Sequence, residues 1–435
     1  MNKKNAIKLF EYESIPYDNT KLKPFSHILN LIEELNESGI ELVSLNRKEL
    51  RAKQMVGLIQ VKELSIEILP KMYIEDASRA KQINNAQRNL LYLLHYCYDI
   101  PIYESEIALM QARKSNWFEI LTFIFSKKLI DLFKKGAHKQ YISVEENLPI
   151  FKGKWMIQKH FHINPFQKHR FYVNYDEFSP DVPLNQTLRF VANKLKSQSN
   201  DSENRKNLRI LDQQMEEVTL LADPASVLNN IIFTRLNENY RPVFNLAKLF
   251  IEGNVVETST GSDGAYAFVF DMNMLFERFI AKFIKENRDA ILPEYLKNCS
   301  IYIQAVTNQR PLAKNLDGKG VFPLKPDIIF KEGDSVKLII DTKYKILNKT
   351  ERKNSVSISD MYQMAAYASR YECSNVILLY PRTAGVNNSI LEEYKLENIN
   401  CKIKIVSIDL RTDFTDSTNK SKLLNELSEI LQREV

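Results

Sequence analysis

The sequence is poor in several features that would place it outside the soluble globular class. Glycine is scarce, with 11 residues in 435, while tyrosine and phenylalanine are plentiful, which argues against long disordered linkers. The four cysteines are dispersed without a C-x-x-C pair, which offers no zinc site and fits a reducing compartment. No apolar run approaches a membrane span, and no apolar stretch of a secretory signal follows Met1-Asn2-Lys3-Lys4. We therefore expect a cytoplasmic protein.

Nucleotide-binding and repeat signatures are also missing. The chain has no G-x-x-x-x-G-K-[ST] motif, so we expect no P-loop nucleotide site of its own, and it has no internal repeat. The formal net charge of +6 is mild, and it permits nucleic-acid binding without requiring it. What is present, 44% apolar and 26% charged residues, is typical of a soluble globular protein of two or three domains.

The pattern along the chain predicts a multidomain protein of mixed α+β and α/β class. Residues 1–75 are expected to form a β-rich N-terminal domain, and residues 76–252 a mainly helical middle region. A segment rich in Ser, Thr and Gly, Gly253–Ala265, marks the expected main boundary. Residues 253–435 then hold helices and strands in the order of a restriction-endonuclease-like domain.

Two local patterns support the N-terminal prediction. The alternating Leu64, Ile66 and Ile68 are typical of a half-buried strand. A helix is expected over residues 27–36, closed near Gly39. Neither pattern carries catalytic chemistry.

The most informative stretch runs from Pro326 to Lys343 and reads PDIIFKEGDSVKLIIDTK. Two β-branched runs flank a polar turn that contains glycine, which predicts a β-hairpin. Antiparallel pairing would bring Asp327, at the start of one strand, close to Asp341, at the end of its partner. Asp341 and Lys343 are two residues apart and therefore point to the same face of the strand.

This set of side chains suits metal-assisted phosphodiester hydrolysis. Two carboxylates, Asp327 and Asp341, can bind a hard divalent cation, for which Mg²⁺ is the expected choice, and Thr342 between the motif residues is a further candidate ligand. The metal would polarise a phosphoryl oxygen and activate water, while Lys343 would orient that water or stabilise charge on the phosphate. The pattern resembles the PD-(D/E)xK nucleases. An ordinary surface hairpin with charged ends is the alternative.

Two predicted helices flank the hairpin and add candidate site residues. Glu277 lies beside the apolar stripe of a periodic helix that begins near Phe270, and it could supply a further metal ligand or remain a solvated helix charge. Gln363 and Tyr367 are four residues apart on a second helix and so share one face. Their spacing resembles the helix after the active-site strands in RecB-type nucleases, although Tyr367 could equally be a core residue.

Two segments carry basic residues that could contact DNA. His160–Tyr175 interleaves lysine, histidine and arginine with aromatic residues, a pattern that can grip a phosphate backbone and stack on bases. A loop whose aromatic residues anchor the core is the alternative. Asn308–Lys319 is expected to be a basic loop near the hairpin, in contact with phosphates or simply solvated.

The order of these segments resembles the McrC family, the nuclease subunits of McrBC modification-dependent restriction systems. The resemblance implies a Mg²⁺-dependent endonuclease that cleaves double-stranded modified DNA, with 5-methylcytosine as the modified base. It implies a partner, a hexameric McrB-like AAA+ GTPase, which residues 1–252 engage and whose hydrolysis they stimulate. The matching pieces are Ile68-Leu69-Pro70-Lys71, Tyr175-Asp176-Glu177-Phe178-Ser179-Pro180-Asp181 with Asn185, Phe270-Asp271-Met272-Asn273-Met274-Leu275-Phe276-Glu277, Pro326-Asp327, Asp341-Thr342-Lys343-Tyr344-Lys345, and Asp360 with Gln363 and Tyr367.

Two other functions remain open at the level of sequence. A stand-alone repair or recombination nuclease of the RecB type would cut DNA without any GTPase. A non-catalytic regulator would only stimulate an AAA+ partner and would carry an idle nuclease fold. The complete set of Asp327, Asp341 and Lys343 argues against the regulator.

Overall fold

The chain forms two compact units in the computed structural model. One unit combines Met1–Ile107 with Gly253–Val435, and the other is Ala108–Glu252. The expected boundary near residue 253 coincides with the division, but the first and last parts of the chain share one unit. The structure describes residues 5–19, 22, 32, 42–45, 48–61, 64–72, 74, 77–100, 116–167, 169–228, 230–257, 265–304, 309–345, 356–382, 388–397 and 399–432. The helix expected over residues 27–36 lies outside the described residues, Ile32 excepted.

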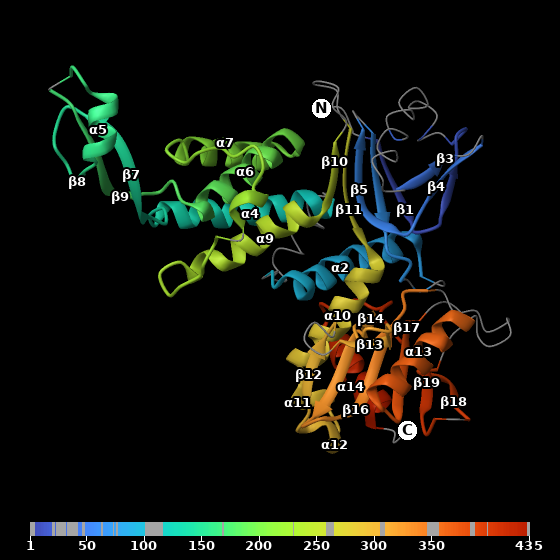
Figure 1. Ribbon diagram of the computed structural model, residues 1–435. Coiled ribbons are helices and arrows are strands. Elements are labelled where there is room, and N and C mark those ends of the chain that lie inside the picture. The colour runs from blue at the N-terminus through green and yellow to red at the C-terminus, as the bar shows by residue number, and fades with distance from the viewer. Residues whose placement is uncertain are drawn as a thin grey trace. The chain divides into compact units, whose positions relative to one another are not determined.

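A five-stranded sheet explains why the two chain segments share a unit. Its order is β1-β6-β5-β11-β10, with β1 and β6 parallel and the other pairs antiparallel (Figure 1). Strands β10 and β11 follow the expected boundary in sequence, yet they complete the sheet begun near the N-terminus. The strands are β1 (Asn5–Phe10), β5 (Met55–Val61), β6 (Leu64–Leu69), β10 (Asn254–Glu257) and β11 (Ala265–Asp271).

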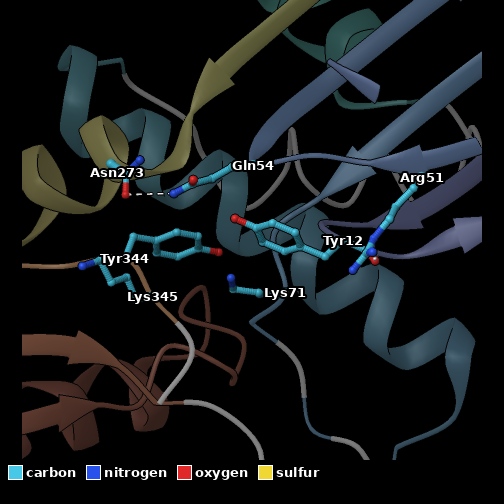
Figure 2. A pocket seen from close by; sticks show the side chains of 7 residues that line it. All are labelled: Tyr12, Arg51, Gln54, Lys71, Asn273, Tyr344 and Lys345. Atoms are coloured by element: carbon cyan, nitrogen blue, oxygen red, sulfur yellow. Dashed lines mark hydrogen bonds between the residues drawn. The ribbon is translucent and has the colours of Figure 1, made fainter. Parts of the chain in front are cut away.

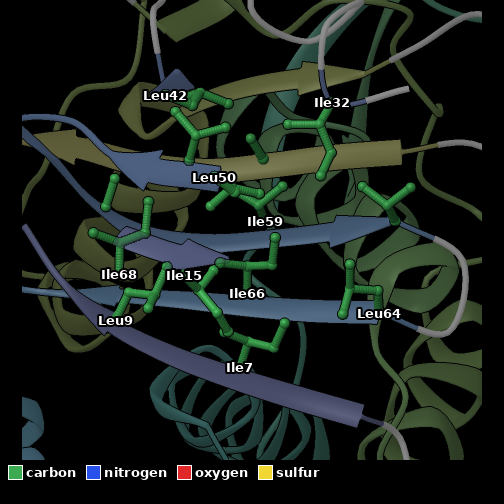
Figure 3. Close-up of a cluster of buried hydrophobic side chains, with 14 of the residues drawn as sticks. Ile7, Leu9, Ile15, Ile32, Leu42, Leu50, Ile59, Leu64, Ile66 and Ile68 are labelled. Atoms are coloured by element: carbon green, nitrogen blue, oxygen red, sulfur yellow. The ribbon is translucent and has the colours of Figure 1, made fainter. Parts of the chain in front are cut away.

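Aliphatic side chains form the core on one face of this sheet (Figure 3). A second, three-stranded sheet of order β2-β4-β3 contributes to the same core, with strands β2 (Ser14–Pro16), β3 (Val43–Leu45) and β4 (Glu49–Ala52). Every residue of β6 is buried, so the expected half-buried strand is wrong in this respect. The reason is helix α2 (Arg79–Tyr98), which covers the other face, where Gln87 donates to the Glu67 carboxylate at 2.7 Å.

Helix α2 also packs against α10 (Met272–Glu286), the helix that leads into the C-terminal part of the unit. Aromatic rings form this contact, with the centroids of Tyr96 and Phe279 5.5 Å apart and perpendicular. Asp271 caps α10 by accepting a hydrogen bond from the amide of Asn273 at 2.8 Å. Residues 76–100 therefore belong with the chain ends rather than with the middle region that the sequence predicted.

The C-terminal part holds a six-stranded sheet of order β12-β15-β16-β17-β19-β18. The predicted order of helix, three strands, helix and two strands is confirmed by α10, β12, β15, β16, α13, β17 and β19, and β18 is an additional edge strand. Helix α14 ends the described chain, and short helices α11 (Arg288–Ile291) and α12 (Glu294–Lys297) follow α10. The bounds are β12 (Ser300–Ile303), β15 (Ile328–Glu332), β16 (Ser335–Thr342), α13 (Ile358–Tyr371), β17 (Asn375–Pro381), β18 (Ile390–Lys395), β19 (Lys402–Ile408) and α14 (Ser417–Gln432).

The segment expected as a basic loop over Asn308–Lys319 instead contributes a strand to a two-stranded ribbon. Strand β13 (Arg310–Lys314) pairs with β14 (Gly320–Leu324). The Asn315 side chain accepts from the Lys319 amide at 2.7 Å and so supports the turn between the strands. Arg370 of α13 donates to the Pro311 carbonyl at 2.9 Å, which holds the ribbon on that helix.

The second unit combines helices with a small sheet that the sequence did not predict. Its three strands pair in the order β7-β9-β8, and α5 lies within the same segment of chain. The basic and aromatic stretch His160–Tyr175 is divided between α5 and β9. The elements are α4 (Trp117–Lys134), β7 (Gln140–Leu148), β8 (Lys154–Trp155), α5 (Ile157–Ile163), β9 (Phe171–Ser179), α6 (Pro183–Gln198), α7 (Ser202–Gln214), α8 (Ala225–Leu228), η2 (Glu238–Tyr240) and α9 (Arg241–Glu252). Across the described ranges of both units, every helix is too short or too polar to cross a membrane.

Candidate active site

The hairpin of β15 and β16 brings Asp327 and the end of β16 together, as predicted. Ile328 and Ile340 are direct partners in the antiparallel register, and Gly333 adopts a φ of 57° in the turn. Asp327 accepts two hydrogen bonds through Oδ2, from the Thr342 amide at 2.7 Å and from the Thr342 hydroxyl at 2.6 Å. These two hydrogen bonds hold the Asp327 carboxylate against Thr342, which lies between Asp341 and Lys343 in sequence.

Asp341 and Lys343 form an ion pair, with Lys343 Nζ 2.6 Å from Asp341 Oδ2. The Asp341 side chain is 1% exposed and that of Lys343 is 20% exposed, so the ammonium is the part of the pair that solvent or a substrate can reach. The Lys343 amide donates to the Leu379 carbonyl at 2.8 Å and extends the parallel pairing of β16 with β17. The chain therefore holds Lys343 in extended geometry, on the same face as Asp341.

The electrostatics of the site are those of crowded, buried acids. The pKa of Asp341 is raised to about 7: burial is the main cause, the neighbouring Asp327 adds to it, and Lys343 opposes both effects. Burial also raises the pKa of Asp327, against the hydrogen bonds from Thr342. Burial alone would lower the pKa of Lys343, but Asp341 and the other acids more than offset it, so that pKa is raised. Such a cluster attracts a cation, and perturbed acids of this kind are frequent at functional sites.

Glu277 of α10 joins the same environment. Burial and then Asp327 raise the pKa of its carboxyl group, and it accepts a hydrogen bond from Gln304 Nε2 at 2.9 Å. The Gln304 amide in turn donates to the Asp327 carbonyl at 2.7 Å, and Gln304 has a φ of 53°, a conformation uncommon outside glycine. Glu277 is therefore not a solvated helix charge. A pocket of about 350 Å³ opens here, lined by Glu277, Gln304, Gln309, Lys325 and Asp327.

Gln363 and Tyr367 share one face of α13, and their side chains bond to each other. Gln363 Nε2 donates to the Tyr367 hydroxyl at 2.6 Å, and that hydroxyl donates to the Lys325 carbonyl at 3.2 Å. The Tyr367 ring packs in the hydrophobic core beneath the sheet, as the core interpretation expected. Its hydroxyl contacts the backbone two residues before Asp327, and a role of Tyr367 in the site stays a prediction.

The oxygen donors of the site suit the metal that the sequence suggests. Mg²⁺ is usually held by one or two carboxylates together with water and substrate phosphate, and the Asp327–Asp341 pair offers such hard oxygen donors. The buried Asp341 Oδ2, whose contact is the Lys343 ammonium, gives this pair an oxygen that a cation would satisfy. In the described part of the chain, however, no three His, Cys, Asp or Glu side chains form a ready ligand set. A two-carboxylate site therefore fits, while Glu277 and Thr342 as ligands stay predictions.

Several residues of the site were not found from the sequence. Gln304 and Lys325 lie on loops, and only the fold brings them to Asp327. Asp360 of α13 pairs with Lys345 Nζ at 2.9 Å and accepts from the Tyr380 hydroxyl at 3.2 Å. It also acts electrostatically on Asp341 and Lys343. Asp360 and Lys345 were both among the matching segments of the sequence, but their ion pair was not predicted, because β16 ends at Thr342 and only the fold brings Lys345 to α13.

Comparisons with known proteins identify a family and a similar fold. The model of a family described as "McrBC 5-methylcytosine restriction system component" matches residues 50–381. A solved structure, the refined half-complex from the tetradecameric assembly of Thermococcus gammatolerans McrB AAA+ hexamers with bound McrC, is similar with a TM-score of 0.66 and 20% identity. That match covers 98% of this chain and 100% of that one.

A second solved structure, the cryo-EM structure of the Thermococcus gammatolerans McrBC complex, has a TM-score of 0.48 and 23% identity. It covers 65% of this chain and 88% of that one. No curated protein matches the sequence. The family match spans most of the chain, and the first structure supports the fold across nearly all of it.

Proposed function

Because the chain belongs to the family of McrBC 5-methylcytosine restriction system components, in its McrC branch, we propose that it is the DNA-cleaving subunit of such a system. In this proposal the PD…DTK hairpin is a PD-(D/E)xK active site, and the reaction is Mg²⁺-dependent hydrolysis of phosphodiester bonds in DNA that carries 5-methylcytosine. The observation that carries the proposal is the buried Asp341 ion-paired with the partly exposed Lys343, directly beside Asp327.

The residues present suit each task of the reaction. Asp327 and Asp341 would hold Mg²⁺, which when bound polarises a phosphoryl oxygen and lowers the pKa of water. Lys343 presents its ammonium at the exposed end of the ion pair, where it can bind a phosphate oxygen and stabilise negative charge that develops there. Its raised pKa keeps it charged at neutral pH. Gln304 and Tyr367 hold Glu277 and the backbone before Asp327 in position.

We further propose that the chain works with a hexameric AAA+ GTPase partner and stimulates its hydrolysis. The solved structure of McrB AAA+ hexamers with bound McrC, similar to this chain over nearly its whole length, supports a partner of that kind. The segment of β7, α5, β8 and β9 in the second unit offers a contact surface (Figure 1). Large apolar side chains are exposed along it, and such concentrations mark protein interaction sites. They are Tyr141, Ile150, Phe151, Trp155, Ile157, Phe161, Ile163, Phe166 and Phe178.

The test is a cleavage assay with methylated plasmid DNA, the partner GTPase, GTP and Mg²⁺. Lys343→Met should lower the cleavage rate by about 10²- to 10³-fold, the usual cost of removing a group that stabilises transition-state charge. Lys337→Met is the matched control, because Lys337 lies near the start of the same strand, with a side chain that is 39% exposed and 3.4 Å from Glu332. It should cut at the wild-type rate.

Three outcomes would count against parts of the proposal. Wild-type cleavage by Lys343→Met would remove the hairpin from the active site. Robust cleavage without the partner would favour the RecB-type nuclease. Absence of any metal-dependent cleavage by the wild-type chain, with hydrolysis by the partner still stimulated, would favour the non-catalytic regulator.

A further inference from the structure

A second, larger pocket lies in the first unit and is separate from the one at Asp327. Its volume is about 580 Å³, and N-terminal residues together with residues that follow β11 and β16 form its walls (Figure 2). Its described lining residues carry cationic, phenolic and amide side chains, and none of them has a carboxylate. The lining residues are Tyr12, Arg51, Gln54, Lys71, Asn273, Tyr344 and Lys345.

Lys71 stands at the centre of this pocket. Its ammonium lies 4.3 Å from the centroid of the Tyr12 ring and 5.2 Å from that of the Tyr344 ring. Among the described residues, no carboxylate is within ion-pair distance of the ammonium of Lys71 or of the guanidinium of Arg51. Arg51 instead donates from Nε to the Tyr12 carbonyl at 3.2 Å. Two cationic groups are thus held by aromatic rings and a carbonyl, with capacity left for an anion.

Within the described ranges, three acids lie near the pocket and each is already engaged, and one of them, Glu11, also acts electrostatically on Lys71. Glu11 is fully buried and accepts from the Tyr344 hydroxyl at 2.6 Å and from the Lys71 amide at 3.1 Å. Burial raises the pKa of Glu11 to about 7, so it carries only part of a charge at neutral pH. Asp271 caps α10 at the Asn273 amide, and Asp360 pairs with Lys345. The cations of the pocket therefore outweigh its acids.

The pocket is connected to the candidate active site through one short stretch of chain. Lys345 follows Lys343 by two residues, and Asp360, its partner, also acts electrostatically on Asp341 and Lys343. Four residues of extended chain span at most about 14 Å from Asp341 to Lys345. Since one DNA strand advances 3.4 Å per nucleotide along the helix axis, that span corresponds to roughly four nucleotides.

We propose that this pocket binds a phosphodiester group of the DNA strand within roughly four nucleotides of the bond that is cut. Lys71 and Arg51 contact the phosphate oxygens, Gln54 and Asn273 offer hydrogen bonds to sugar or phosphate, and the partly exposed ring of Tyr12 accepts a base or ribose. The proposal rests on the proposed function and extends it, because it gives the N-terminal part of the chain a direct role in holding the substrate.

The test is the salt dependence of binding between the full-length chain and a short methylated DNA duplex, measured without metal so that no cleavage occurs. Lys71→Gln and Arg51→Gln should each reduce the slope of log K against log salt by about 0.9, the value for one lost phosphate contact in duplex DNA. The same relation gives about fivefold weaker binding at 0.15 M salt for each variant. Lys71→Arg and Arg51→Lys keep the charge and should restore most of the affinity.

Lys402→Gln is the matched control. Lys402 is an exposed lysine at the start of β19, and β16, β17 and β19 are parallel, so it lies at the opposite end of these strands from Asp341. Lys402→Gln lowers the net charge by the same amount as Lys71→Gln and Arg51→Gln, but it should leave the slope of log K against log salt unchanged. Melting temperatures of all variants check that the fold is kept, and the exposed Arg51 provides a test even if Lys71→Gln unfolds the chain.

The outcomes separate this proposal from the proposed function. If Lys71→Gln and Arg51→Gln bind and cut like the wild type, the pocket is no DNA subsite although the nuclease assignment stands. If the control variant weakens binding as much as the other two, the effect is one of general charge, and the pocket proposal fails. If deoxyguanosine 5′-phosphate binds the wild type and not Lys71→Gln while duplex affinity is unaltered, the pocket takes free nucleotides, which also overturns it. A wild-type chain that neither binds nor cuts DNA would overturn both.

Discussion

At the scale of single residues, the network around Glu11 shows how tightly the two parts of the first unit are joined. Tyr344 directly follows the Asp341-Thr342-Lys343 motif and is fully buried. Its hydroxyl donates to the carboxylate of Glu11, which also accepts from the amide of Lys71, sixty residues further along the chain. Burial raises the pKa of Tyr344 well above its ordinary value, so it acts as a hydrogen-bond donor throughout the accessible pH range. The strand end that carries the candidate catalytic lysine is therefore anchored in the N-terminal sheet.

The raised pKa of Glu11 predicts how the stability of the chain depends on pH. Its pKa is raised from 4.5 to about 7 in the folded chain, so folding favours its protonated form. The stability that this group contributes is complete below about pH 4.5 and is lost as the pH rises through about 7. Glu11→Gln keeps an oxygen acceptor for Tyr344 and Lys71 but does not titrate. Between about pH 5 and about pH 8 the wild type should lose roughly 3 kcal/mol of unfolding free energy relative to this variant.

Urea denaturation of both proteins across that range measures the difference. Titrations of the other acids are common to the two chains and cancel in the comparison. Parallel curves for the wild type and Glu11→Gln would show that Glu11 ionises normally in the folded chain.

At the scale of elements, β11 holds the N-terminal sheet together across the gap in sequence. Gly57 of β5 has a φ of 151°, and a Cβ atom there would lie 2.2 Å from the Phe268 carbonyl oxygen and 2.7 Å from Val269 Cα. Both atoms belong to the β11 backbone, which cannot move without breaking the sheet. Only glycine permits this close approach of the two strands.

Gly57→Ala should therefore lower the free energy of unfolding of the first unit by at least about 2 kcal/mol more than the same substitution at another glycine of positive φ. Gly333→Ala is the control, because Gly333 also has a positive φ, 57°, but a Cβ there would meet nothing within 4 Å. Thermal unfolding of both variants decides the matter. Equal losses of melting temperature would mean that backbone strain alone, and not the approach of β11, explains the requirement for glycine.

The elements that were predicted correctly from the sequence are those set by local signals. The hairpin of β15 and β16 has β-branched runs and a glycine in its turn. Helix α13 begins at Ile358, and the preceding Ser357 caps it by accepting a hydrogen bond from the Asp360 amide at 3.1 Å. The pairing of β11 with β5 was not predictable in this way, since over two hundred residues separate the strands. The positive φ of Gln304 and its bond to Glu277 likewise depend on the assembled fold.

At the scale of the whole molecule, the division into two units changes which fragments of the chain should fold on their own. A fragment that ends at Glu252 lacks β10 and β11, so the edge of β5 would be uncovered and the core would lose Ala267 and Val269. The site residues were all assigned to positions between Glu277 and Tyr367, but the sheet beside them is built from both ends of the chain. The N-terminal half is thus not an independent module.

We predict that residues 1–107 of a Met1–Glu252 fragment are digested rapidly by protease, whereas Ala108–Glu252 alone resists as it does in the full chain. Limited proteolysis followed by mass spectrometry of the products measures this. Equal resistance of the first 107 residues in the fragment and in the full chain would show that they fold without β10 and β11.

The central claim is that DNA cleavage takes place at Asp327, Asp341 and Lys343. It is tested most directly by Asp341→Asn, assayed for cleavage of methylated plasmid and for GTP hydrolysis by the partner in the same reaction. The substitution keeps the size of the side chain and removes the charge that pairs with Lys343. We predict that cleavage falls by at least about 10²-fold while stimulated hydrolysis stays at the wild-type rate. Cleavage at the wild-type rate, or an equal fall of both activities, would contradict the account.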